Sequence, residues 1–288
     1  MNLTIRLETP GDYRTVEELT RDAFWGCVGH ETTDGEHLLV HKLRDLPCFV
    51  PELDFVAEAD GKLVGNVLYS LAKVVTPQEK EIEVLTFGPL SVAPAYKGKG
   101  VGARLMRHSI AEAKRLEYRA IIFFGHPDYY PRLGFRRGSE FGITNADGAS
   151  FDALMAMPLY PGALDGVTGR FQEDPAFTVD PAETAEFDMG FPAKEPVRQL
   201  TVEELQDQFP EHLLAVLRAH KMTRLGDFLR VSGGQMLDWA GMSRQDLSLI
   251  NGILTEYGYP KKVAKWHYED DRAVAEPLKG HAILPSSS

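Results

Sequence analysis

The stretch from Leu85 to Gly102, LTFGPLSVAPAYKGKGVG, constrains the fold most. An apolar run broken by Gly88-Pro89 leads into a glycine-rich loop, and a helical pattern follows at once. This order predicts a strand, a loop and the N-terminus of a helix. The first N–H groups of a helix have no partner inside it, and glycines let a ligand approach the backbone closely. The stretch therefore predicts a binding site for an anion such as a pyrophosphate.

The size and charge of the chain limit the classes of protein to which it can belong. With 288 residues, the chain can bury a full core as one large domain or two unequal ones. Its 43% hydrophobic and 25% charged residues are ordinary for a globular protein. The formal net charge of −11 argues against a nucleic-acid partner, because such binding needs lysine and arginine to neutralise phosphate. The same charge would attract cationic substrates weakly.

Cysteine usage and the first residues favour a cytoplasmic location. Cys27 and Cys48 are far apart and form no Cys-x-x-Cys motif, so we expect neither a disulfide framework nor a cysteine metal site. The N-terminal MNLTIRLETP lacks a basic segment followed by an apolar one, and no apolar run is long enough to span a bilayer. We therefore expect reduced thiols and no membrane partner.

The chain before the glycine loop predicts a strand, two helices and an antiparallel meander. The expected elements are a strand over 3–7, a helix that follows it through 24, a helix over 35–46, and strands over 55–59, 63–71 and 82–92. Asp60-Gly61 lies between two apolar-rich runs and is a strong hairpin signal. Pro89 cannot donate to a ladder, which predicts a bulge or splayed pairing in the last strand. A splay there would leave the backbone of residues 90–92 free for a ligand.

After the loop, the pattern predicts the rest of this domain and a separate helical module. The expected elements are a helix over 101–116, a strand over 120–124 covered on both faces, a loop with a short helix over 125–135, and strands within 152–158 and 166–171. Residues 173–196 are acidic, contain proline and lack periodicity, so we interpret them as a surface linker. The domains expected are thus 1–172, the linker, and a helical module over 197–288 with a disordered tail.

Two motifs resemble the signatures of the GNAT superfamily of acetyl-CoA-dependent N-acetyltransferases. Val92-Ala-Pro followed by Lys97-x-x-Gly100-x-Gly102 is similar to the superfamily loop (Gln/Arg)-x-x-Gly-x-(Gly/Ala), with Lys97 in place of the usual glutamine or arginine. Downstream, Tyr130-Pro-Arg-Leu-Gly-Phe is similar to the second signature, a tyrosine four residues before Gly-Phe. The resemblance covers about residues 1–160. It implies an α+β fold, in which helices flank a mixed, mostly antiparallel central sheet.

The resemblance also implies a cofactor and a reaction. The reaction would be direct transfer of the acetyl group of acetyl-CoA to a primary amine of a small molecule or a protein. The implied pyrophosphate contacts are Lys97, Gly98, Lys99, Gly100, Val101 and Gly102, and the implied pantetheine contacts are Leu90, Ser91 and Val92. The loop would bind phosphate mainly through backbone N–H groups, so we expect the change to Lys97 to matter little.

Acetyl transfer to an amine needs a group that protonates the leaving thiolate and a base that deprotonates the ammonium. Tyr130, at the superfamily tyrosine position, is the candidate acid, with Tyr129 as the alternative. Glu83 is the candidate base because many relatives use a glutamate of the fourth strand. His126, expected at the end of the fifth strand, titrates near neutral pH and is a further candidate, although the following proline equally fits a rigid corner.

The helices that precede the meander usually line the acceptor site in this superfamily. Trp25, His30 and Glu31 are therefore candidate residues on the substrate side. His37 and His41 lie four residues apart and would share a helix face, but no HExxH order or cysteine accompanies them. A polar surface helix is the simpler interpretation, so we expect no metal.

The C-terminal region more faintly resembles the helical C-terminal domain of the bacterial RNA polymerase alpha subunit. The shared features are apolar spacing, the Gly-Asp turn at 226–227 and the closing Glu-Tyr-Gly at 256–258. The positions that contact DNA in that family do not carry over, so we expect a protein-contact module, a lid or a dimerisation element. The alternative to an enzyme is accordingly a regulatory CoA-binding protein whose helical module docks a partner.

Overall fold

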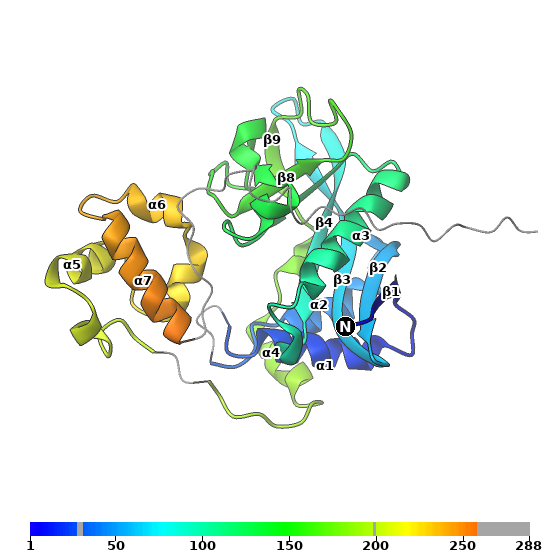
Figure 1. Ribbon diagram of the computed structural model, residues 1–288. Coiled ribbons are helices and arrows are strands. Elements are labelled where there is room, and N and C mark those ends of the chain that lie inside the picture. Colours follow the sequence, from blue (N-terminus) through cyan, green and yellow to red (C-terminus); the bar gives the residue numbers. More distant parts are fainter. Residues whose placement is uncertain (28–30, 198–199, 258–288) are drawn as a thin grey trace, which may run out of the picture.

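The computed structural model describes residues 1–27, 31–197 and 200–257, and a mixed β-sheet forms its centre (Figure 1). The strands are β1 (Leu3–Leu7), β2 (Phe49–Ala59), β3 (Lys62–Val75), β4 (Glu81–Val92), β5 (Ala120–Phe124), β6 (Arg136–Arg137), β7 (Ile143–Thr144), β8 (Leu154–Pro158) and β9 (Gly169–Gln172). Their order is β1-β2-β3-β4-β5-β8-β6, and β9 pairs with β3 and β7. β1 to β4 are antiparallel and β5 is parallel to β4, which confirms the predicted α+β architecture.

Helices cover both faces of the sheet. They are α1 (Tyr13–Phe24), α2 (Glu36–Leu43) and α3 (Val101–Arg115). Leu105 of α3 packs with Tyr69 of β3 on one face, whereas Leu39 of α2 packs with Leu68 of β3 on the other. Successive strand residues point to opposite faces of the sheet, so Leu68 packs in the layer of α2 and its neighbour Tyr69 in the layer of α3. A ligand that reaches the sheet therefore meets α3 on one face and α1 with α2 on the other.

The hairpin predicted at Asp60-Gly61 is confirmed. Ala59 of β2 pairs with Lys62 of β3, so the turn contains these two residues alone. Asp60 has φ +52° and Gly61 has φ +74°, the left-handed values that a tight type I′ hairpin requires. The turn thereby sets the register of the strand pair that leads into β4.

β4 contains the irregularity predicted at Pro89. Val67 of β3 pairs with Leu90, but Tyr69 pairs with Phe87, so β4 has one residue more than β3 over this interval. The extra residue is accommodated around Pro89 because proline has no N–H to give to the ladder. The bulge lies between the exposed start of β4 and the glycine loop.

The splay between β4 and β5 begins before this bulge. Within the described residues, these two strands pair at one position, Leu85 opposite Ile121. β5 is buried from Ala120 to Phe123 as predicted, but the side chain of Phe124 is 41% exposed and stacks on Phe151 at a centroid distance of 5.5 Å. The end of β5 is uncovered because the sheet opens at this point.

The segment predicted as a linker is a structured strap, defined here as residues 173–197. It contains a 3-10 helix (Pro175–Phe177) and α4 (Pro181–Asp188), which packs beside α1 and α2. Arg21 of α1 donates to both carboxylate oxygens of Asp188, and the buried ring of His37 lies 5.3 Å from Phe187. The hydrophobic periodicity of the sequence does not predict this packing, because only a few isolated aromatic and charged side chains attach the segment to α1 and α2.

The helical module after the strap has its own apolar core. Its helices are α5 (Glu211–Ala219), α6 (Gly233–Leu237) and α7 (Arg244–Glu256), with 3-10 turns over Gln206–Gln208 and Leu225–Arg230. Leu217 of α5, Phe228 and Ile250 of α7 are among its buried side chains. The predicted helical character of this region is confirmed by α5, α6 and α7, whereas residues 201–205 form a bridge and turns and Leu225–Arg230 is 3-10 helix. The predicted disordered tail lies outside the described residues.

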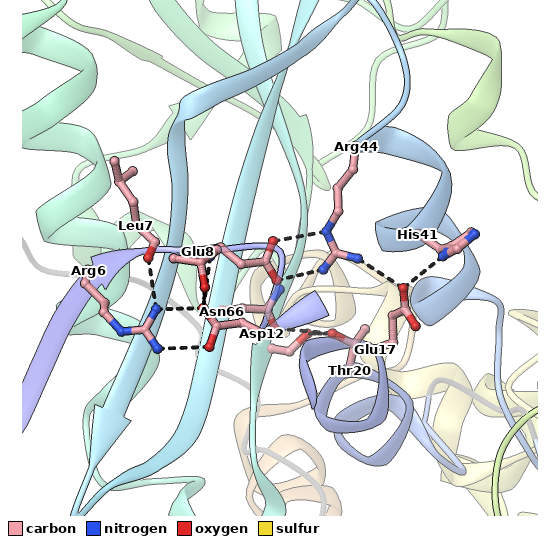
Figure 2. A network of polar contacts seen from close by, with 11 residues as sticks. Arg6, Leu7, Glu8, Asp12, Glu17, Thr20, His41, Arg44 and Asn66 are labelled. Atoms are coloured by element: carbon pink, nitrogen blue, oxygen red, sulfur yellow. Dashed lines mark hydrogen bonds and ion pairs between the residues drawn. The ribbon is translucent and has the colours of Figure 1, made fainter. Parts of the chain in front are cut away.

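A network of buried charges attaches α1 and α2 to β1 (Figure 2). Arg44 donates to Glu8 at 2.7 and 3.0 Å and to Glu17 at 3.1 Å. Glu17 also contacts His41 Nδ1 at 2.9 Å. Burial and a hydrogen bond to Glu8 raise the pKa of Asp54 to about 9, so this carboxyl is protonated at neutral pH. Because a buried charge without partners is costly, these contacts fix the positions of the two helices on the sheet.

Candidate active site

The glycine loop has the geometry of an anion site. The chain makes a 3-10 turn at Pro94–Tyr96 and then passes Gly98 (φ +75°) and Gly100 (φ +81°), both left-handed. A Cβ atom on either glycine would meet nothing within 4 Å, so they are needed for the backbone conformation and not for packing. Gly100 is the N-cap of α3, and no side-chain cap hydrogen bond is formed at this helix end within the described residues. The first-turn N–H groups of α3 therefore suit a phosphate.

Lys97 has a structural task in this loop. Its Nζ donates to the carbonyl oxygen of Ala23 at 2.8 Å, near the C-terminal end of α1. The contact ties the loop to α1 and engages the terminal nitrogen of the side chain. The side chain that departs from glutamine or arginine at this position therefore forms a contact within the protein.

The strand before the loop is paired on one edge. Leu90, Ser91 and Val92 lie in register with residues 65–67 of β3, and their other edge faces the gap that β5 leaves. The Ser91 side chain is buried and donates to Thr20 of α1 at 3.0 Å, so its hydroxyl belongs to the core. The main chain of this segment is the part that can bind a ligand.

Tyr130 lies beside the bulge of β4 in an aromatic cluster. Its ring centroid is 4.5 Å from that of Phe123 and 5.8 Å from those of Phe87 and Phe135. Gly125 is required next to it, because a Cβ atom there would come within 2.5 Å of the Tyr130 ring. Burial, with the nearby charge of Glu36 as a smaller cause, raises the pKa of Tyr130 far above its ordinary value. The hydroxyl therefore stays protonated and can act as a hydrogen-bond donor at any working pH.

Tyr129 serves the other end of the site. Its hydroxyl oxygen lies 3.3 Å from the position that a Cβ atom would take on Gly102, above the first turn of α3. The Arg132 guanidinium lies 4.7 Å from the ring centroid. Burial raises the pKa of Tyr129, opposed by the charges of Arg132 and Arg107. The two tyrosines are thus divided between the glycine loop and the bulge.

Two carboxylates that sequence reasoning missed lie near the bulge. Glu173 begins the strap and accepts a hydrogen bond from Thr86 Oγ1 of β4 at 3.1 Å. Glu36 begins α2, and the charges of Asp34 and Glu173 act on it. Burial raises the pKa of Glu36 to about 8 and that of Glu173 to about 7. The sequence indicates these two residues only by their positions, since Glu173 directly follows a strand and Glu36 begins a helix.

The structure places Glu83 away from this site. It lies on β4 opposite Lys73, it is exposed, and its charge acts on Tyr118. Five residues of strand separate it from Gly88, roughly 17 Å at the usual rise. Glu81 is paired with Lys73 and is also exposed. The strand-four glutamate therefore does not reach Tyr130, because it sits at the end of β4 remote from the bulge.

His126 and the substrate-side candidates have structural contacts. His126 Nδ1 accepts from the N–H of Asp128 at 3.2 Å, so the ring stabilises the turn before Tyr129, as a rigid corner would. Trp25 Nε1 donates to the carbonyl of Glu195 in the strap at 3.0 Å. The Glu31 carbonyl accepts from the N–H of Val197, while its side chain is exposed. His30 lies outside the described residues.

Neither a metal cluster nor a membrane helix is found in the part of the chain that the structure describes. No group of three or more histidine, cysteine, aspartate or glutamate side chains there could hold a metal ion. No described helix combines the length and the apolar composition that crossing a bilayer requires.

Comparison with known proteins agrees with this geometry. Residues 52–137 match the acetyltransferase (GNAT) domain family. The uncharacterized N-acetyltransferase YhbS of Escherichia coli is 29% identical over 168 residues, which are 58% of this chain and 93% of that protein. The uncharacterized N-acetyltransferase YjhQ of Escherichia coli is 35% identical over 85 residues, which are 30% of this chain and 46% of that protein.

Solved structures show the same fold. The crystal structure of YhbS from Escherichia coli in complex with CoA has a TM-score of 0.54 and 27% identity, and the match covers 62% of this chain and 92% of that one. A GNAT family acetyltransferase from Brucella melitensis in complex with acetyl-CoA has a TM-score of 0.50 and 25% identity, with 62% and 99% covered. The protein therefore carries a GNAT acetyltransferase domain, the fold of an acyltransferase enzyme.

Proposed function

We propose that this protein is an N-acetyltransferase that moves the acetyl group of acetyl-CoA directly to a primary amine of a small molecule or a protein. The observation that carries the proposal is the combination of an uncapped α3 N-terminus behind Gly98 and Gly100 with Tyr130 at the splay of β4 and β5. The relatives with CoA or acetyl-CoA bound support the choice of cofactor.

The residues present fit this cofactor. The backbone of 97–102 would hold the pyrophosphate, and the unpaired edge of 90–92 would hold the pantetheine arm by main-chain hydrogen bonds. Bound acetyl-CoA would supply the acetyl group as a thioester. The Lys97 side chain serves the loop as a tie to α1, and the Ser91 hydroxyl is not proposed as a contact.

Tyr130 is the proposed hydrogen-bond donor to the sulfur that leaves. A thiolate is stabilised by a donor placed beside it, and the raised pKa of Tyr130 keeps that donor protonated. Tyr129 is the less suitable candidate because its hydroxyl lies over Gly102 at the loop. Trp25 and Glu31 are not proposed as acceptor contacts, since their polar contacts hold the strap.

Two measurements test the proposed function. Calorimetry with acetyl-CoA should show saturable binding, and a panel of primary amines incubated with enzyme and acetyl-CoA should yield products heavier by one acetyl group in mass spectrometry. Absence of binding at millimolar acetyl-CoA would contradict the cofactor, and binding without any acetylated amine would favour the regulatory alternative.

One contact between the helical module and the rest of the protein bears on the regulatory alternative. Ser232, the N-cap of α6, donates to Asp152 Oδ2 at 3.0 Å, and Asp152 also pairs with Arg137 at 3.0 Å. The helical module thus contacts the loop before β8. A docking or dimerisation role for this module, including its resemblance to the RNA polymerase alpha domain, stays a proposal. Size-exclusion chromatography with light scattering would test the dimer.

A further inference from the structure

We propose that Glu173 accepts the proton of the acceptor amine. The inference rests on the proposed function, because it assigns a base to the reaction proposed there. It places that base on the strap, outside the residues that match the family and outside the strand to which the sequence pointed.

Glu173 is fixed at the point where the sheet opens. Its Oε1 accepts from Thr86, which is fully buried on β4 two residues before Gly88. Four residues further along the strap, the Phe177 ring lies against Gly88, where a Cβ atom would come within 3.1 Å of it. The strap therefore covers the bulge on the face of α2 and holds the carboxylate next to it.

Tyr130 flanks the same stretch of β4 from the other face. Phe87, whose ring is 5.8 Å from that of Tyr130, belongs to the core under α3, and its neighbour Thr86 points the opposite way. The charge of Glu36 nevertheless acts on Tyr130. Beyond Leu85, no ladder pair joins β4 to β5 among the described residues, so at this edge the sheet itself does not separate the two faces. In this proposal, the amine enters on the α2 face and meets Glu173 on its way to the thioester.

The surroundings of these two carboxyl groups contain no cation within the described part of the chain. Neither Glu36 nor Glu173 forms an ion pair there with lysine, arginine or histidine, although both are partly buried. A further polar group nearby is the fully buried Ser70 hydroxyl, on β3 directly opposite Thr86, which has no hydrogen-bond partner among the described residues. A shielded Glu173 carboxylate without a cation and an unsatisfied hydroxyl together indicate a place for a polar group such as an amine.

The environment gives Glu173 the proton affinity that a base needs. The charges of Asp34 and Glu173 act on Glu36, whereas burial and the Thr86 hydroxyl act on Glu173. Burial raises the pKa of Glu173, while the Thr86 hydrogen bond lowers it, and it lies at about 7. A base whose pKa is near the working pH is both available and strong enough to be useful.

The proton balance of the step is simple. An ammonium loses two protons on becoming an amide: one passes to Glu173 and then to water, and the other ends on the departing sulfur, which Tyr130 stabilises. The nitrogen–carbon bond forms as the carbon–sulfur bond breaks. No oxidant, reductant or metal is needed.

The test compares Glu173→Gln on the strap with Glu83→Gln, the same change at an exposed position of β4. With an amine accepted in the panel above, we expect kcat of Glu173→Gln to fall by about 10²–10⁴-fold with unchanged acetyl-CoA affinity and melting temperature. Glu83→Gln should keep the wild-type rate. Loss of the acidic limb of the pH–rate profile in Glu173→Gln identifies the base, and retention of both the rate and this limb would overturn the proposal.

Thr86→Val tests the hydrogen bond that lowers the pKa of Glu173. Removing the Thr86 donor should shift the acidic limb of the pH–rate profile to higher pH. Carboxyl carbon NMR titration of the same proteins gives a readout without any substrate. A Glu173 carboxyl that titrates at its ordinary value, or that does not respond to Thr86→Val, would overturn the assignment. If Glu173 titrates near neutral pH and no amine is acetylated, the proposed function fails and the role as base fails with it.

Discussion

The hydroxyl oxygen of Tyr129 lies 3.3 Å from the place where a Cβ atom of residue 102 would be, so Gly102 leaves room for this side chain above α3. This relationship joins the two motifs that suggested the family. A substitution at Gly102 is therefore expected to move Tyr129, and a substitution at Tyr129 is expected to alter the surroundings of the glycine loop.

We expect Gly102→Ala to weaken acetyl-CoA binding without destabilising the fold. Alanine favours a helix over glycine by up to about 1 kcal/mol, but here its methyl group must displace Tyr129 by a few tenths of an ångström. Gly252→Ala in α7, where nothing lies within 4 Å, is the matched control and should only stabilise. Calorimetry and chemical denaturation check both. Equal acetyl-CoA affinity for wild type and Gly102→Ala would contradict the prediction.

Tyr130→Phe should lower kcat and leave acetyl-CoA affinity intact. The variant keeps the ring that packs on Phe123 and removes only the donor to the departing sulfur. A loss of about 10²-fold is expected from the removal of one such donor. Tyr129→Phe, which changes the loop end, is the control and should affect affinity more than rate. A Tyr130→Phe enzyme with full rate would remove this residue from the mechanism.

The stability of the fold should fall as the pH rises from about 5 to 9 because of Asp54. Its folded pKa of about 9 lies above the unfolded value of about 3.9, so folded Asp54 retains a proton that the unfolded chain loses. The stability that this proton contributes is complete below the unfolded pKa and is lost through the folded pKa. In urea unfolding at several pH values, the free energy of unfolding of Asp54→Asn should depend less on pH than that of the wild type. The control Asp45→Asn, at an exposed position, should keep the wild-type pH dependence.

Loosening the strap should impair acceptor use and leave the cofactor site unaffected. Phe187→Ala removes the ring that packs on His37 and His41 and so weakens the attachment of α4 to α2. We expect faster hydrogen exchange over 173–197 and a higher KM for the amine, with unchanged acetyl-CoA affinity. Met189→Ala, a strap side chain that is 78% exposed, is the control. An unchanged KM together with faster exchange would show that the strap does not form the acceptor site.

Local signals in the sequence were sufficient for the cofactor side. Asp60-Gly61 specifies its turn because both residues adopt left-handed conformations. Pro89 interrupts the hydrogen-bonded ladder of β4 because it has no N–H, and the left-handed Gly100 begins α3. Each is a property of a few neighbouring residues, so the hairpin, the bulge and the glycine loop were predictable without knowing the rest of the fold. The order of strands and helices followed from the same local rules.

The acceptor side depends on contacts between distant segments. Glu83 lies on the expected strand, but only the extent of β4 shows that it lies near the end of the strand that is remote from the bulge. Glu173 meets Thr86, which is 87 positions away, through the strap that isolated aromatic anchors hold against α1 and α2. Neighbouring residues in the chain determined the turns and the glycine loop. The surroundings of Glu36 and Glu173 were decided by tertiary packing, because burial and nearby charges act through space and leave no periodic pattern in the sequence.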